Sequence, residues 1–241
     1  MNEARFLLLQ VRDPDDPIRE HEASCFSRAL GTGNGQLQSF DLLTGAPSPA
    51  HLDAVDVVLI GGSGDYSVVR GGAWLPAALE AMVGLYESGK PTFASCWGFQ
   101  ALARALGGEV VTDRDRAEVG TVWLELTPEG ARDPVFGPVG PRFAVQIGHE
   151  DIVTALPEGA VLLASSETIE NEAFCFPGKP IYATQFHPEL DRAGLIARIA
   201  RYPAYLPLTG ASSLEEFRKM TPETPEAESI MPRFLRHVLD E

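Results

Sequence analysis

The sequence contains few cysteines, and their spacing fits no cysteine-based framework. There are three among 241 residues, Cys25, Cys96 and Cys175, an odd number spread widely along the chain. This excludes a disulfide scaffold of paired cysteines and a zinc knuckle of closely spaced ligands. Free thiols are stable in a reducing environment, so we expect a cytoplasmic location for this chain.

Membrane and nucleic-acid signals are also missing. No apolar run approaches the roughly 18 residues of a membrane-spanning helix, and residues 1–4 do not begin a basic leader. Basic residues are scarce, because 19 Lys and Arg stand against 34 Asp and Glu, for a net charge of −15. Such a surface repels phosphates, so we expect neither nucleic acid nor a membrane as a partner.

What the chain does contain is an alternation of apolar runs and helical patterns. The predicted strands and helices of this part are strands 6–11, 36–43, 55–60 and 91–93 and helices 18–30, 73–88 and 101–106. Strands that alternate with helices form βαβ units and parallel sheets. The fold class predicted is therefore α/β, with an open, mostly parallel sheet flanked by helices.

After residue 108 the pattern changes to short strands separated by Pro-Gly turns, which predicts a smaller mixed or antiparallel sheet added to the core. These strands are 109–112, 119–126, 142–147, 160–165, 172–176 and 181–185. Helical patterns follow at 190–200, 213–220 and 226–238. We expect one domain over residues 1–200 and a short helical C-terminal extension, 201–241, that packs on the same domain.

Cys96 stands where a predicted strand turns into a helix. The residue two before it, Ala94, and the residue two after it, Gly98, are small. Small neighbours at these positions are typical of a nucleophile elbow, where a sharp turn lifts one side chain clear of the sheet. The helix N-terminus would also favour a thiolate and an oxyanion at this place. A small buried core cysteine is the alternative interpretation of this stretch alone.

A nucleophilic cysteine needs a base and a group that orients the base. Of the five histidines, His149 and His187 follow apolar strands and could face the same edge of the sheet. His187 has the better surroundings, because Glu189 can turn back to fix the imidazole tautomer. Taken alone, His-Pro-Glu could equally be a surface loop. The glycine-rich stretch 61–64 follows another strand, where a plain tight turn is the alternative to a site.

Together these motifs resemble the class I, or triad, glutamine amidotransferases. The family pattern Gly-x-Cys-x-Gly-x-Gln is matched from Cys96 to Gln100, with Ala94 in place of the first glycine. The stretch 185–189 matches the second signature of the family. Residues 61–64 look like its oxyanion loop without the usual proline, and 148–151 resemble the Ser-His-Gly-Asp of the GMP-synthase subgroup. The resemblance covers roughly residues 5–200.

The resemblance implies a flavodoxin-like amidotransferase fold, no metal and no cofactor. It implies a triad in which Cys96 attacks L-glutamine, His187 carries the proton and Glu189 orients His187, so that a glutamyl thioester forms and ammonia is released. The oxyanion hole would be formed by the backbone N–H of Trp97 and one from either Gly62 or Ser63, and Gln100, Glu118 and His149 would help to shape the substrate pocket. For Gln100 a core-edge amide, and for Glu118 a solvated charge, are equally good interpretations.

Two further functions remain open. One is the hydrolysis of other γ-glutamyl compounds or peptides, and the other is a non-catalytic binding or regulatory module. Residues 201–241 are too short for an ATP-using synthetase, but they could dock a separate synthetase subunit as the ammonia acceptor. The same segment could instead cover the core or form a homodimer contact. The sequence identifies neither the ammonia acceptor nor the pathway.

Overall fold

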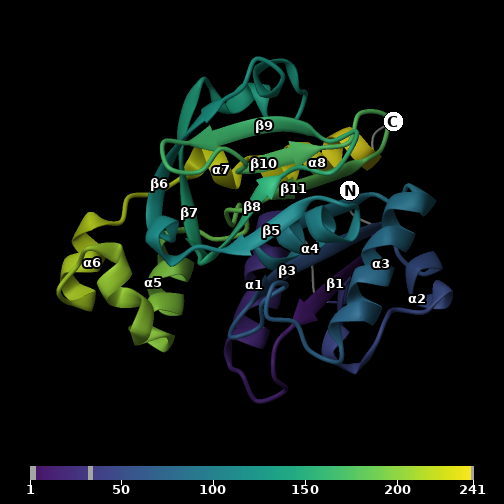
Figure 1. Cartoon of the computed structure of the whole chain (residues 1–241), viewed down its shortest axis with the longest axis horizontal. Coiled ribbons are helices and arrows are strands. Elements are labelled where there is room, and N and C mark those ends of the chain that lie inside the picture. Colours follow the sequence, from purple (N-terminus) through teal and green to yellow (C-terminus); the bar gives the residue numbers. More distant parts are fainter. Residues whose placement is uncertain (1–3, 32–34, 240–241) are drawn as a thin grey trace.

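Eleven strands form two sheets in the computed structural model, which describes residues 4–31 and 35–239 (Figure 1). The parallel strands are β1 (Phe6–Val11), β2 (Leu37–Asp41), β3 (Val57–Ser63), β4 (Thr92–Ser95) and β11 (Ile181–Thr184). The antiparallel strands are β6 (Glu118–Leu126), β7 (Arg142–His149), β9 (Val161–Ser166) and β10 (Ala173–Cys175). These nine strands share one sheet in the order β2-β1-β3-β4-β11-β10-β9-β6-β7.

The remaining strands, β5 (Glu109–Thr112) and β8 (Asp151–Ala155), pair as a separate antiparallel sheet. The predicted α/β class, with a parallel core and an antiparallel addition, is confirmed. Most of the addition continues the main sheet on the far side of β11, and only β5 and β8 stand apart from it.

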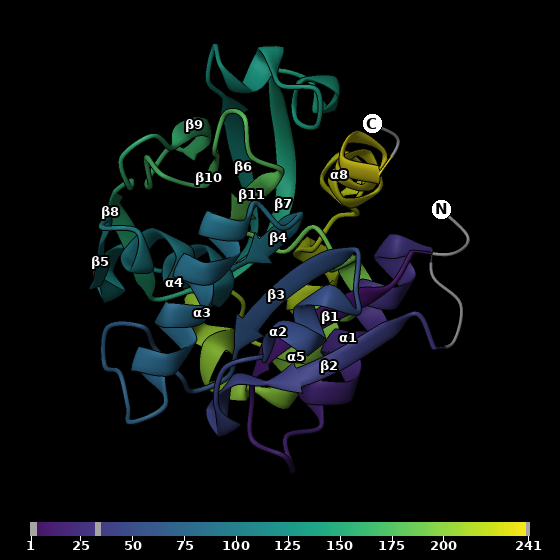
Figure 2. The ribbon, with the colours of Figure 1, turned by 90° about the vertical axis from the view of Figure 1, so that its right-hand side faces the viewer.

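Helices cover both faces of the parallel strands (Figure 2). One face is covered by α1 (Ile18–Leu30) and α8 (Ile230–Leu239), and the other by α3 (Leu75–Ser88) and α4 (Trp97–Ala105). Side chains alternate between the faces along each strand. In β3, Leu59 therefore joins the first apolar cluster and Val58 the second. Both faces being buried explains the continuous apolar runs that predicted the strands.

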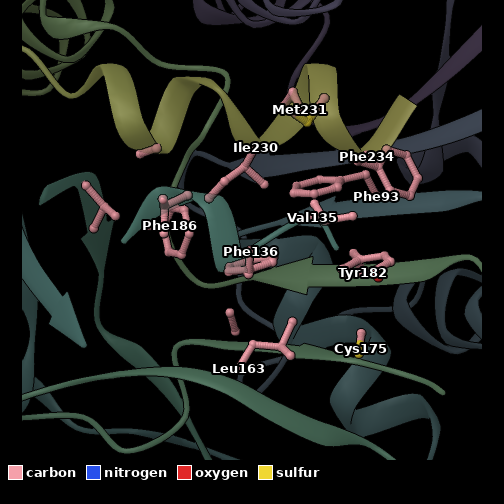
Figure 3. Close-up of a cluster of buried hydrophobic side chains, with 14 of the residues drawn as sticks. Phe93, Val135, Phe136, Leu163, Cys175, Tyr182, Phe186, Ile230, Met231 and Phe234 are labelled. Carbon is pink, nitrogen blue, oxygen red and sulfur yellow. The ribbon is translucent and has the colours of Figure 1, made fainter. Parts of the chain in front are cut away.

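The last helix, α8, is part of the main core (Figure 3). Its Phe234 packs edge-to-face on Phe93 of β4, with ring centroids 5.2 Å apart, and on Tyr182 of β11 at 5.7 Å. The predicted helix 226–238 is divided in two, into α7 (Pro225–Glu228) and α8. The reason is Pro232, which has no N–H and is tolerated only in the first turn of a helix.

A third, smaller apolar cluster lies under α5 (Arg192–Arg201), the 3₁₀ helix η5 (Pro203–Thr209) and α6 (Leu214–Met220). Leu195, Ile199 and Phe217 pack there against Val119 of β6. Figures 1 and 2 both place α5 well apart from α8. The region after residue 200 therefore covers two different places: α6 packs with α5 on the smaller cluster, and α8 packs on the main core. Helix α5 itself runs through residue 200. The domain boundary expected at residue 200 stays a prediction.

Two elements were not predicted, and one strand is longer than predicted. Strand β3 continues through Gly61 and Gly62, because Ser63 still pairs with Val11 of β1. Strand β8 follows β7 after a single residue, with no Gly or Pro to mark the turn, and α2 (Pro49–Asp53) is very short. Among the residues that the structure describes, none of the helices is both long and apolar enough to cross a lipid bilayer.

Candidate active site

Cys96 occupies a strained turn between β4 and α4. Its φ of 52° and ψ of −103° make it the one non-glycine residue with a positive φ in the described part of the chain. Gly98 lets the first turn of α4 approach β3, because a Cβ there would lie 2.7 Å from Ile60 Cγ2 and 3.0 Å from its carbonyl oxygen. The local sequence thus forms the elbow that was predicted. Strain of this kind persists only where the surroundings hold it.

His187 and Glu189 lie together beside the elbow. His187 Nδ1 is 2.7 Å from Glu189 Oε1, and both side chains are buried. Cys96 and His187 line the same cavity. A Cβ added at Gly62 would lie 3.0 Å from His187 Cε1 and 3.7 Å from Cys96 Cβ, so this glycine makes room for both. The Cys96 thiol is 3.7 Å from the carbonyl oxygen of Gly148, and none of the hydrogen bonds found between described residues joins it to His187.

A buried arginine completes this group. Arg198 of α5 has its Nη1 3.3 Å from His187 Nδ1 and its Nη2 3.6 Å from Glu189 Oε1. Burial lowers the pKa of His187, the Glu189 charge raises it, and the Arg198 charge lowers it, with a net lowering. Burial raises the pKa of the Cys96 thiol to about 12. The resting pair is therefore a neutral thiol and a neutral imidazole.

A second buried ion pair, Arg12 with Glu22, lies beneath the glycine-rich stretch. Arg12 donates to both carboxylate oxygens of Glu22, at 3.0 and 3.1 Å. Burial raises the pKa of Glu22, but Arg12 lowers it and the net shift is downward, so this group is charged. The same carboxylate accepts the backbone N–H of Gly62 at 3.1 Å. Of the three candidate N–H groups for the oxyanion hole, that of Gly62 is therefore already engaged.

Two cavities flank Cys96, and both include Ser63, Gly148 and Tyr205 in their walls. The first lies on the side of His187 and has a mostly apolar lining with two guanidinium groups, those of Arg12 and Arg198. Its further residues include Arg198, Leu195, Ile199, Tyr202 and Val119. The second is polar and lies toward β8. Its further residues include Ser67, Arg70, Gln100, His149 and Asp151.

The structure brings two of the three expected pocket residues to Cys96. Gln100 and His149 line the second cavity, although Gln100 Nε2 already donates to the Asp151 carbonyl at 2.8 Å and to Gln185 at 3.1 Å. Glu118 lines neither cavity, among the described residues. It accepts a hydrogen bond from Ser166 at 2.7 Å and faces His149.

Sequence reasoning missed the buried charges Arg198 and Glu22. A signal was present, because each stands within the apolar stripe of its helix. Glu22 lies four residues after Ile18 and four before Phe26, and Arg198 lies three after Leu195. Charged residues at such positions must find a partner in the interior.

Comparison with known proteins supports the resemblance found in the motifs. The family model of glutamine amidotransferase class-I matches residues 40–193. A subunit of the glutamine-hydrolyzing GMP synthase of Methanothermobacter thermautotrophicus is 39% identical over 100 residues, which are 42% of this chain and 52% of the relative. The corresponding subunit of Methanosarcina barkeri is 35% identical over 127 residues, which are 53% and 65% of the two chains. The chain thus spans about half to two thirds of these relatives.

Solved structures share the fold over the full length. A glutamine amidotransferase of Thermotoga maritima has a TM-score of 0.77 at 19% identity, with all of both chains covered. A glutamine amido transferase of Methylobacillus flagellatus has a TM-score of 0.76 at 20% identity and covers 98% of this chain and 95% of its own. At these identities the likeness shows the fold.

Proposed function

The chain belongs to the class I glutamine amidotransferase family, and from that premise we propose that it hydrolyses the side-chain amide of L-glutamine to glutamate and ammonia. The observation that carries the proposal is the convergence of three groups. Cys96 stands on a strained elbow, His187 shares its cavity, and Glu189 is 2.7 Å from the imidazole. This is the set that nucleophilic catalysis by a thiol requires.

Proton transfer begins at His187. Glu189 accepts the Nδ1–H, so Nε2, which lies 3.4 Å from Arg198 Nη1, is the nitrogen that takes the proton. Because the thiol pKa is raised to about 12, Cys96 loses its proton to His187 as the sulfur attacks the amide carbon. The oxyanion that forms is stabilised by the N–H groups of Trp97 and Ser63. Loss of one such donor costs about 3 kcal/mol in other enzymes.

His187 then gives the proton to the departing nitrogen. The carbon–nitrogen bond breaks, ammonia leaves and a glutamyl thioester on Cys96 remains. In the second half, His187 takes a proton from water, the hydroxide attacks the thioester carbonyl, and the thiolate leaves and is reprotonated. Glutamine and water are consumed, and glutamate and ammonia are produced. We place the glutamine in the polar cavity of Gln100 and His149, so that ammonia departs on the His187 side.

The names of the relatives support a proposal for where the ammonia goes. Those of Methanothermobacter and Methanosarcina are each named as one subunit of a glutamine-hydrolyzing GMP synthase, and we propose that this chain likewise delivers ammonia to a separate synthetase subunit. A catalytic thiol must stay reduced, which favours the cytoplasm as its location. A homodimer contact through the C-terminal region stays a prediction.

A second candidate substrate class is favoured by the cavity beside His187. This cavity, lined by Arg198 and Tyr202, lies on the side of Cys96 where the leaving group departs. It offers space and a cation for a leaving group larger than ammonia, such as the amino acid of a γ-glutamyl peptide. Hydrolysis of γ-glutamyl compounds uses the same triad and differs only in this subsite.

The test is glutamate release from L-glutamine by the purified protein. We expect release by the natural chain and its loss in Cys96→Ala, with the fold unchanged. Cys175→Ala is the matched control, because Cys175 is also buried but belongs to the main core. Undiminished turnover by Cys96→Ala would contradict the triad. A silent natural chain whose Cys96 still reacts with a glutamine-like electrophile would favour γ-glutamyl substrates or a required partner, and absence of both would favour the non-catalytic module.

A further inference from the structure

Three buried side chains near the site face one another, and the atoms that they turn toward one another form no hydrogen bonds at ordinary distances. Glu118 begins β6, His149 ends β7 directly opposite it, and Glu172 precedes β10. Their ligand atoms all lie within 4.8 Å of one another. Glu172 is 0% exposed, and neither of its carboxylate oxygens has a hydrogen-bond partner. Glu118 Oε2 and His149 Nε2 have none either.

The surrounding hydrogen bonds leave a lone pair on each of these atoms. His149 Nδ1 is 3.1 Å from the carbonyl oxygen of Asp151. A carbonyl only accepts, so Nδ1 carries a proton, and in the neutral imidazole Nε2 then presents a lone pair. Ser166 donates to Glu118 Oε1, which orients the carboxylate and leaves Oε2 toward His149. Ligand imidazoles and carboxylates in metal sites are oriented by outer partners in this way.

Electrostatics requires a positive charge among these groups. Two carboxylates and an imidazole lone pair, all removed from water, repel one another and lose their hydration. A divalent cation would make the set of two carboxylates and a neutral imidazole electrically neutral. The distance from His149 Nε2 to Glu118 Oε2 is 3.5 Å. Two ligands of a tetrahedral ion with bonds of about 2.1 Å are about 3.4 Å apart, which agrees with this spacing.

We propose that Glu118, His149 and Glu172 bind one divalent transition-metal ion, with Zn²⁺ as the best match. An imidazole beside two carboxylates disfavours Mg²⁺ and Ca²⁺, which prefer oxygen ligands only. Three protein ligands leave one position for water. The ion would join β6, β7 and the start of β10 next to Gly148, whose carbonyl faces the Cys96 thiol. It would stabilise this corner of the fold, and its ligand His149 would be held in the wall of the cavity proposed for glutamine.

The first test is metal analysis of the full chain, purified in metal-free buffer after expression with zinc. We expect one zinc ion per chain by inductively coupled plasma mass spectrometry. Glu172→Gln, which keeps the shape of the side chain, and His149→Gln should each lose it. Glu170→Gln is the matched control, because Glu170 is an exposed carboxylate two residues from Glu172, and it should keep full occupancy. Equal zinc in Glu172→Gln and the natural chain would overturn the proposal.

The thiol of Cys96 is a competing ligand, so the same analysis is made on Cys96→Ala. We expect Cys96→Ala to keep its zinc. We also expect the natural chain, when substituted with Co²⁺, to show no thiolate-to-metal charge-transfer band. Loss of the zinc in Cys96→Ala would overturn the proposal, since the metal would then be bound at the nucleophile.

A proton is the other positive charge that could neutralise the cluster. Burial and the Glu118 charge raise the pKa of Glu172 well above its ordinary value. If the cluster binds a metal, Zn²⁺ should raise the Tm of the metal-free natural chain and leave the Tm of Glu172→Gln unchanged. If Zn²⁺ changes neither Tm, a shared proton holds the cluster and the metal proposal fails. All of these readouts are independent of glutaminase activity.

Discussion

At the scale of single residues, Arg198 is one of the groups that set the pKa of the proposed base, His187. Burial lowers the pKa of His187, Glu189 raises it and Arg198 lowers it. Removing the cation in Arg198→Met favours the imidazolium, so the pKa of His187 should rise. The acid limb of kcat/KM against pH then moves to higher pH, because more alkaline solution is needed to free the base. Arg201→Met, an exposed change on the same helix, should leave the limb in place, and an unmoved limb in Arg198→Met would contradict the assignment.

Glu189 fixes the tautomer of His187, and its loss should be severe without being complete. In Glu189→Gln the amide cannot hold the Nδ1–H tautomer by charge. We expect kcat for glutamate release to fall by roughly 10³- to 10⁴-fold, by analogy with amide replacement in a serine-protease triad. The residual rate should still exceed that of Cys96→Ala, which sets the background. A kcat equal to that of the natural chain would show that Glu189 does not orient the base.

The triad candidates could be predicted because their motifs are local. The small neighbours of Cys96 indicate the elbow, and Glu189 stands two residues from His187. In each case the residues that interact in space are also close in the sequence. Arg198 and Glu22 reach the same place from two separate helices. The apolar stripe of each helix indicated that these charges are buried, but no short stretch shows which helix faces meet across the sheet and so which partners the charges find. For the same reason Glu118 was assigned to the pocket, whereas its side chain turns toward His149.

At the scale of elements, the elbow depends on how closely α4 approaches β3. Gly98→Ala would place a Cβ 2.7 Å from Ile60 Cγ2 and 3.0 Å from the Ile60 carbonyl oxygen. We expect it to lower the free energy of unfolding by about 1–3 kcal/mol, as overpacking does, and to reduce activity by displacing Cys96. Urea unfolding measured by circular dichroism checks the first expectation.

The matched control is a glycine in another helix. Gly84 of α3 is exposed, and a Cβ there would meet nothing within 4 Å. Gly84→Ala should therefore raise the free energy of unfolding by about 0.5–1 kcal/mol through helix propensity alone. If both substitutions acted alike, the close contact between α4 and β3 would not be what the glycine serves.

Element boundaries were predictable where side chains set them and not where pairing did. An apolar run located β1, and Gly31 located the end of α1, because both signals are local in the sequence. Gly61 and Gly62 indicated a loop, yet they form an irregularity within β3, because Ser63 after them pairs again with Val11 of β1. Strand β8 gains its identity only from its partner β5. Pairing across the chain overrides local propensity, which is weak in strands.

At the scale of the whole molecule, the order of the strands in the main sheet could not be predicted from the sequence. Strand β11 lies beside β4, and β10, β9, β6 and β7 then extend the sheet in an order unlike that of the chain. This places His187, just after β11, next to Cys96, just after β4. Adjacent parallel strands end at the same edge of a sheet, so the pairing of β4 with β11 brings the two candidate residues together.

The packing of the whole molecule also determines whether the chain can fold without its C-terminal helices. Deleting residues 225–241 removes α7 and α8, and with them four fully buried apolar side chains, Ile230, Met231, Phe234 and Leu235. Burial of each contributes about 1.5–3 kcal/mol, so the loss is about 6–12 kcal/mol. That is comparable with the entire stability of an ordinary domain, about 5–15 kcal/mol. Phe93 and Tyr182, which pack on Phe234, would also be uncovered next to the strands that carry the site.

We therefore expect the chain shortened to residues 1–224 to lack a cooperative unfolding transition and to aggregate on purification. Phe234→Ala in the full chain is the milder companion, and it should lower the free energy of unfolding by about 3–5 kcal/mol while keeping a single transition. Exposed Met220→Ala in α6 is the control and should change little. A shortened chain that unfolds cooperatively and still releases glutamate would show that α8 is an appendage, and that the residues before it form the complete folding unit.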